Sequence, residues 1–124
     1  MTNILVVEDD LPVRTVIRRM LEAEGHTVFE AENGKEAMAL YHREQIDLVI
    51  MDIILPEKEG LETIKELKRE SPEIKIIAIS GGGKVKPPFY LNLARKFGAD
   101  RTFEKPFAWK QLVRTVTELL EGSS

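Results

Sequence analysis

Ile4-Leu5-Val6-Val7-Glu8-Asp9-Asp10, near the start of the chain, joins four apolar residues to three acidic ones. A short apolar run without alternation predicts a strand that is covered on both faces, as in a parallel sheet. The pattern returns at 47–51, directly ahead of Asp52. It returns again at 74–79, directly ahead of Ser80. The repeated pattern predicts several buried parallel strands, each followed by a polar residue.

Amphipathic helices are predicted between these strands, because apolar residues recur there at the spacing of a helix face. Asp10 is expected to cap the first helix and Gly25 to end it. The remaining elements are weaker strands at 27–30 and 101–104 and helices at 34–44, 61–70, 89–97 and 108–121. Strand and helix thus alternate along the chain. This alternation predicts an α/β fold, a doubly wound five-stranded parallel sheet with five helices.

The chain has 124 residues, which is the length of one ordinary domain. Its 43% hydrophobic and 31% charged residues are typical of a globular protein. We expect one domain over 1–121 and a frayed tail at 122–124. Inside the domain, 84–88 is predicted to be a loop, because the adjacent prolines Pro87 and Pro88 do not fit a regular helix interior.

Composition excludes several classes of function. Eighteen basic against 21 acidic residues give a net charge of −3, which argues against direct binding of nucleic acid. The sequence contains no cysteine, so disulfides and thiolate metal sites are excluded. No apolar run approaches the roughly 20 residues of a membrane span, and the N-terminus has no basic region ahead of an apolar stretch. We therefore expect a cytoplasmic protein that does not enter a membrane.

Polar residues follow four of the predicted strands: Glu8, Asp9, Asp52, Ser80 and Lys105. Parallel strands end at the same edge of a sheet, where open α/β folds bind their ligands, so we expect these residues to meet in one crevice. Two carboxylates about 4 Å apart repel by roughly 4 kcal/mol at an effective dielectric of about 20, so a proton or a cation must lie between them. Mg²⁺ suits such a site, because it takes one or two carboxylates and keeps phosphate oxygens and water as further ligands. The lysine and the hydroxyl group would then bind a phosphoryl group.

Four short motifs occur in order along the chain: Ile4-Leu5-Val6-Val7-Glu8-Asp9-Asp10, Met51-Asp52-Ile53-Ile54-Leu55-Pro56 with Gly60, Ser80, and Lys105-Pro106-Phe107. Together they resemble a response regulator receiver domain of two-component signalling, similar to the chemotaxis response regulator. The resemblance covers essentially the whole chain. It implies a flavodoxin-like fold with the strand order 2-1-3-4-5.

The resemblance also implies the roles of the acidic residues. Asp52 would be the phosphoacceptor, and Mg²⁺ would be the cofactor. Asp9 would bind the metal directly and Glu8 through water. Asp52 and the backbone carbonyl of Ile54 would complete the ligand set.

Further implications concern the phosphoryl group and the partners. Ser80 would hydrogen-bond to the phosphoryl group and Lys105 would pair with it, aimed inward by a cis bond to Pro106. The phosphoryl donor would be a sensor histidine kinase or a histidine phosphotransfer protein. An unidentified downstream protein would read the face of the fourth helix, fifth strand and fifth helix. Such a protein catalyses only its own phosphorylation and dephosphorylation, so we do not expect an enzyme.

Alternatives to this function differ in what they require of the sequence. An aspartyl-phosphate hydrolase would carry a second aspartate where Ile54 stands, and a flavodoxin-like cofactor binder would have a Ser-, Thr- and Gly-rich loop at 8–10. A pseudo-receiver that is never phosphorylated and an excised receiver of a larger transcriptional regulator stay open. Thr102 supports the former, because the family usually has an aromatic or histidine switch there. Phe103 cannot replace that switch, since adjacent strand residues point to opposite faces.

Overall fold

The computed structural model describes residues 2–53, 59–80, 87–105 and 107–122. Within them, strands and helices alternate as the sequence predicts. Their bounds are β1 (Asn3–Val7), α1 (Leu11–Ala23), β2 (Thr27–Ala31), α2 (Gly34–Arg43), β3 (Leu48–Asp52), α3 (Glu59–Glu70), β4 (Lys75–Ser80), α4 (Pro87–Phe97), β5 (Arg101–Glu104) and α5 (Trp109–Leu120).

These strands form one parallel sheet in the order β2-β1-β3-β4-β5. The fold class and the strand order expected from the sequence are thereby confirmed. Every residue of the central strand β3 is buried, whereas the edge strands β2 and β5 are mostly half-buried. This difference explains why the edge strands gave the weaker sequence patterns, since a strand needs a continuous apolar run only where both of its faces are covered.

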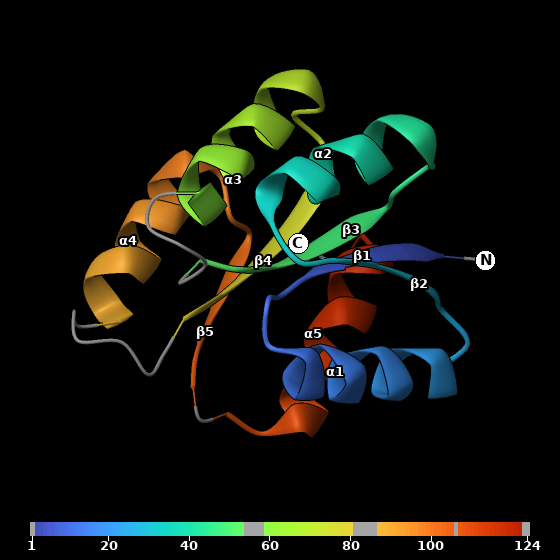
Figure 1. Ribbon diagram of the computed structural model, residues 1–124. Helices are drawn as coiled ribbons and strands as arrows, with labels where there is room; N and C mark the ends of the chain where they lie inside the picture. Colours follow the sequence, from blue (N-terminus) through green and yellow to red (C-terminus); the bar gives the residue numbers. More distant parts are fainter. Residues whose placement is uncertain (1, 54–58, 81–86, 106, 123–124) are drawn as a thin grey trace.

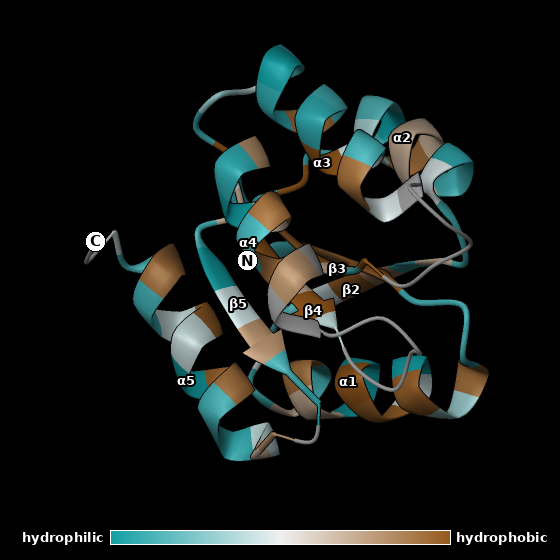
Figure 2. Ribbon diagram, turned by 90° about the vertical axis from the view of Figure 1, so that its left-hand side faces the viewer, coloured by the Kyte–Doolittle hydropathy of each residue, from teal (hydrophilic) through white to brown (hydrophobic). Residues whose placement is uncertain are grey.

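The sheet separates two apolar layers (Figure 1). Leu5 and Val7 of β1 face the layer under α2, α3 and α4. Ile4 and Val6 face the layer under α1 and α5. Successive side chains of a strand point to opposite faces, so one strand supplies both layers. In Figure 2 the inner strands β3 and β4 are coloured brown, the edge strand β5 is mostly teal, and the helices carry both colours.

Side-chain caps define the starts of the first two helices. Asp10 accepts a hydrogen bond from the Val13 backbone N–H over 3.3 Å and caps α1, as predicted. Asn33 caps α2 in the same way through the Glu36 N–H over 2.9 Å. Gly25 follows α1 with a φ of 93°, a left-handed conformation that glycine adopts without strain.

Two helix starts differ from the sequence expectation. Helix α4 begins at Pro87, so the prediction of a loop over 84–88 is wrong for its last two residues. Prolines are tolerated there because the first turn of a helix has no intrahelical partner for its N–H groups. The rest of that predicted loop, 84–86, lies outside the described residues. Helix α3 begins at Glu59 rather than at 61.

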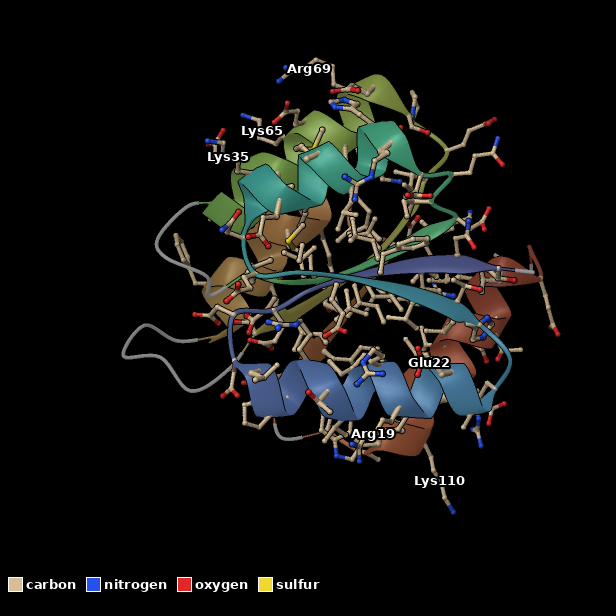
Figure 3. All side chains as sticks on the ribbon, turned by 45° about the vertical axis from the view of Figure 1, so that its right-hand side comes forward. Arg19, Glu22, Lys35, Lys65, Arg69 and Lys110 are labelled. Carbon is tan, nitrogen blue, oxygen red and sulfur yellow. The ribbon has the colours of Figure 1, made fainter. Side chains whose placement is uncertain are left out.

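The outer surfaces of the helices are strongly charged. Exposed side chains such as Lys35 on α2, Arg69 on α3 and Lys110 on α5 extend away from the sheet (Figure 3). Among the residues that the structure describes, no helix combines the length and apolar character needed to cross a membrane.

Candidate functional site

The residues predicted to meet do so at the carboxyl edge of the sheet. Glu8 follows β1, and Asp52 is the last residue of β3. Lys105 follows β5, and its Nζ lies 3.2 Å from Asp52 Oδ2 and 3.3 Å from Glu8 Oε1. One ammonium group therefore joins two carboxylates that come from different strands.

Both of these carboxylates are buried. Glu8 is only 2% exposed and Asp52 only 6% exposed. Burial raises the pKa of Glu8 from 4.5 to about 8, and both a hydrogen bond to Asp52 and its negative charge add to the effect. The Asp10 backbone N–H and the Lys105 charge oppose the rise without cancelling it. Without a cation in the site, Glu8 thus keeps its proton at neutral pH.

Lys105 responds to the same surroundings. Burial on its own would lower the pKa of Lys105, but the charges and hydrogen bonds of Asp52 and Glu8 outweigh burial and raise this pKa above 10.5. Lys105 is therefore a permanent cation at physiological pH. It is suited to holding a negative group at this edge of the sheet.

The backbone fixes the position of these side chains. The Lys105 N–H donates to the Ser80 carbonyl over 2.7 Å, which extends the β4–β5 pairing by one step. The Ile53 N–H likewise donates to the Ile79 carbonyl over 2.9 Å, directly beyond Asp52. Asp52 and Lys105 are thus both anchored to the end of β4.

Ser80 is completely buried at the end of β4, next to this group. Its hydroxyl has no hydrogen-bond partner among the residues that the structure describes. A buried hydroxyl without a partner is unfavourable by about 1–3 kcal/mol. An oxygen of a ligand bound at this edge of the sheet would give the hydroxyl a partner.

The acidic residues form a candidate site for a divalent cation. One carboxylate oxygen from each of Glu8, Asp9 and Asp52 lies within 4.8 Å of the other two. Asp9 is exposed, whereas the other two are buried, so the cluster opens to solvent on one side. Hard carboxylate oxygens are the ligands that Mg²⁺ and Ca²⁺ prefer. The residues present therefore fit the predicted metal, while Ile54 and Pro106 lie outside the described residues.

The departure noted at Thr102 has a defined structural setting. The Thr102 hydroxyl accepts a hydrogen bond from Arg95 Nη2 of α4 over 2.8 Å. Phe103 packs on the opposite face, in the layer under α1 and α5, with its ring 5.2 Å from that of Phe107. Thr102 and Phe103 thus point to opposite faces of β5, as expected, and Phe103 does not take the position of the usual switch residue.

Sequence reasoning missed one residue beside the acidic cluster. Arg14 of α1 donates to the backbone carbonyl of Glu8 over 2.8 Å and to Glu30 over 2.9 Å. Arg14 follows the predicted helix cap Asp10 by four residues. This spacing indicated that Arg14 lies in the first turns of α1, near the acidic cluster. The sequence offered no sign of its partner on β2.

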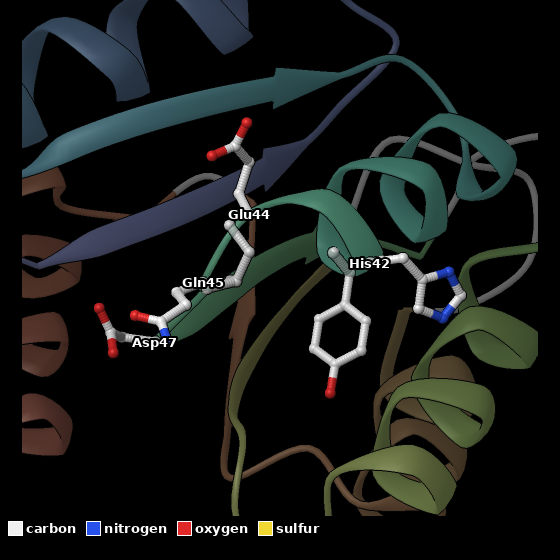
Figure 4. A pocket seen from close by; sticks show the side chains of 6 residues that line it. His42, Glu44, Gln45 and Asp47 are labelled. Atoms are coloured by element: carbon white, nitrogen blue, oxygen red, sulfur yellow. The ribbon is translucent and has the colours of Figure 1, made fainter.

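A separate pocket of about 530 Å³ lies near the opposite edge of the sheet, at the α2–β3 connection; Tyr41, His42, Glu44, Gln45, Ile46 and Asp47 line it (Figure 4). Asp47 accepts a hydrogen bond from the Asn3 backbone, and His42 contacts Glu70 of α3 over 2.7 Å. These polar groups bind neighbouring elements of the fold. We assign no function to this pocket.

Known proteins resemble this chain in sequence and in fold. Residues 4–117 match the response regulator receiver domain family. The sensor kinase CckA of Brucella abortus is 37% identical over 124 residues, covering 96% of this chain and 12% of CckA. The transcriptional regulatory protein CpxR of Klebsiella pneumoniae is 32% identical over 123 residues, covering 99% of this chain and 51% of CpxR. The chain thus spans about half the length of CpxR and a small part of CckA.

A solved structure extends the comparison to three dimensions. The response regulator protein TrrA of Thermotoga maritima, in complex with Mg(2+)-BeF, has a TM-score of 0.83 and 32% sequence identity. The alignment covers 96% of this chain and 99% of TrrA. The family match, the strand order and the acidic cluster at the carboxyl edge lead to the same conclusion. This chain belongs to the response regulator receiver domain family of two-component signalling systems.

Proposed function

We propose that Asp52 accepts a phosphoryl group from the phosphohistidine of a sensor histidine kinase or a histidine phosphotransfer protein. The observation that carries this proposal is the contact of Lys105 Nζ with both Asp52 and Glu8, two buried carboxylates at neighbouring strand ends. Family membership supports it, because receiver domains interact with histidine kinases and downstream effectors.

In the proposed step, a carboxylate oxygen of Asp52 attacks the phosphorus atom of the phosphohistidine. An O–P bond forms as the N–P bond breaks, the electron pair leaves with the imidazole nitrogen, and that nitrogen takes a proton from water. Lys105 donates to the transferred group, and the Ser80 hydroxyl, which has no partner in the described part of the chain, donates to another of its oxygens. In this step the chain both accepts the phosphoryl group and supplies the side chains that promote its transfer from the donor.

Glu8, Asp9 and Asp52 would hold a divalent cation in this reaction, together with the predicted carbonyl of Ile54. A bound Mg²⁺ would neutralise charge on the transferring phosphoryl oxygens. The similarity to TrrA, whose structure is in complex with Mg(2+)-BeF, supports this assignment. Binding of the cation requires Glu8 to release the proton that it holds because its pKa is raised to about 8.

Phosphorylation would then change the protein surface. A phosphorylated side chain carries a charge of about −1.5 to −2 near pH 7, which draws Lys105 and Ser80 towards it. Because the Lys105 N–H is bonded to the Ser80 carbonyl, the ends of β4 and β5 respond together. We propose that a downstream protein reads the resulting change on the face of α4, β5 and α5.

Intact-mass measurement after incubation with acetyl phosphate and Mg²⁺ tests the acceptor. We expect one phosphoryl adduct on the wild-type protein and none on Asp52→Asn. Asp47→Asn is the matched control, because Asp47 precedes the same strand at its other end and is expected to leave the adduct unchanged. An adduct that persists in Asp52→Asn would refute the assignment of the acceptor. Absence of any adduct on the wild-type protein, despite Mg²⁺ binding, would favour a pseudo-receiver.

A further inference from the structure

Arg14 makes two contacts that the proposed function does not use. Its Nη1 donates to the backbone carbonyl of Glu8 over 2.8 Å, and its Nε donates to Glu30 Oε1 over 2.9 Å. The side chain is only 12% exposed, so it is held between α1 and β2. A single guanidinium group thus connects the acidic cluster to the edge strand of the sheet.

The Glu8 carbonyl is part of the peptide group that leads into Asp9. This group is planar, so a bond that holds its oxygen also fixes the direction in which the chain enters Asp9. The Glu8 N–H is held on the other side by the Ala31 carbonyl of β2 over 3.0 Å. Glu8 is thereby fixed at both of its backbone polar groups.

Asp9 depends on this arrangement more than its neighbours do. Glu8 is buried and accepts from the Asp10 N–H over 3.2 Å, and Asp10 caps α1. Asp9 is exposed, and within the described part of the chain no hydrogen bond to its side chain is found. The backbone therefore sets the direction of the Asp9 Cα–Cβ bond, from which the carboxylate extends into the cluster.

We propose that Arg14, anchored by Glu30, is a positioning residue that orients the Glu8–Asp9 peptide so that both carboxylates face one cation. The inference rests on the proposed function, because it requires that the acidic cluster binds Mg²⁺. Arginine suits the role because its planar fork donates in two directions at once, whereas the single ammonium of lysine does not have this geometry.

The charge of Arg14 and its hydrogen bond to Glu8 would affect Mg²⁺ binding in opposite directions. Its positive charge lies close to a cation site, so removing the charge would strengthen Mg²⁺ binding if electrostatics alone mattered. Removing the hydrogen bond to Glu8 would weaken binding if position mattered. The direction of the change therefore separates the two effects.

The experiment is a calorimetric titration of the intact chain with Mg²⁺ alone. We expect Arg14→Gln to weaken Mg²⁺ binding by roughly 10-fold, the lower end of the effect of residues that orient metal ligands. Arg14→Lys keeps the charge but not the fork, and we expect weaker binding than in the wild type as well. Arg18→Gln is the matched control. Arg18 also pairs with Glu30, over 3.0 Å, and its substitution removes the same charge from α1. We expect Arg18→Gln to change the affinity for Mg²⁺ by less than about twofold, since the Arg18–Glu30 ion pair is partly exposed at the surface.

Urea unfolding in the absence of metal verifies that each variant is folded before its affinity is compared. Arg14→Gln binding Mg²⁺ as tightly as the wild type, or more tightly, would overturn the inference. Arg14→Lys binding with wild-type affinity would overturn it as well, since the fork would then be unnecessary. Failure of the wild-type protein itself to bind Mg²⁺ would instead overturn the proposed function on which the inference rests.

Discussion

Replacing Glu8 by glutamine should remove a pH dependence of stability that the buried carboxyl group creates. Burial raises the pKa of Glu8 from 4.5 to about 8 in the folded protein, whereas unfolding restores an ordinary value. Between these values the folded state binds a proton that the unfolded state has lost. The free energy of unfolding therefore falls as the pH rises, because stability follows the difference in bound protons. The stabilisation is complete below the ordinary pKa and is lost as the pH approaches about 8.

The size of the effect follows from the same pKa. One proton gives a slope of at most about 1.4 kcal/mol per pH unit, so the loss between about pH 5 and pH 8 is roughly 3–4 kcal/mol. This is a large share of the 5–15 kcal/mol by which native proteins are ordinarily stable. Lys105 adds no slope in this range, because its pKa is raised above 10.5 and its contribution is lost only at higher pH.

Urea unfolding of the wild type and of Glu8→Gln, in the presence of a chelator and across this pH range, measures the difference directly. Groups far from Glu8 contribute equally to both proteins and therefore cancel in the comparison. We expect the wild type to lose stability relative to Glu8→Gln as the pH rises. Saturating Mg²⁺ should abolish that loss, because the cation takes the place of the proton. Parallel pH profiles for the two proteins would refute the reasoning, as would a relative gain of wild-type stability with rising pH.

Three further substitutions test individual features of the site and its support. Lys105→Met should slow formation of the acetyl phosphate adduct on the order of 10- to 100-fold, because it removes a donor to the transferred group; an unchanged rate by timed intact-mass measurement would exclude that role. Ser80→Ala should leave the free energy of unfolding unchanged or raise it by up to about 1 kcal/mol, because it deletes a buried hydroxyl without a described partner, yet it should slow the adduct. Gly60→Ala should lower the free energy of unfolding by roughly 2–3 kcal/mol, because a Cβ there would lie 2.7 and 3.0 Å from backbone atoms that include the Asp52 carbonyl. Gly25→Ala is its control: nothing lies within 4 Å, so only backbone strain of about 1–2 kcal/mol is expected, and equal losses would contradict the steric argument.

Local patterns in the sequence were sufficient for the architecture. The apolar runs at β1, β3 and β4 predicted buried strands because a strand covered on both faces has no polar side to show. The alternation with amphipathic helices then predicted the parallel sheet, although the strand order came from the family resemblance. Element ends were less predictable. Pro87 begins α4 because a proline that breaks a helix interior is compatible with its first turn, and sequence alone did not place it there.

The sequence also determined which residues share the carboxyl edge, since the residue after each parallel strand must lie there. It could not determine which atoms touch or which groups keep their protons. Lys105 is 97 residues from Glu8 and 53 from Asp52, and only the packing of β1, β3 and β5 brings the three together. The raised pKa of Glu8 and the anchoring of Arg14 between α1 and β2 likewise arise from burial and from contacts between elements. Burial and contacts between elements depend on distances in the folded chain, which no local sequence pattern encodes. Only the tertiary structure therefore decided which atoms touch and which groups keep their protons.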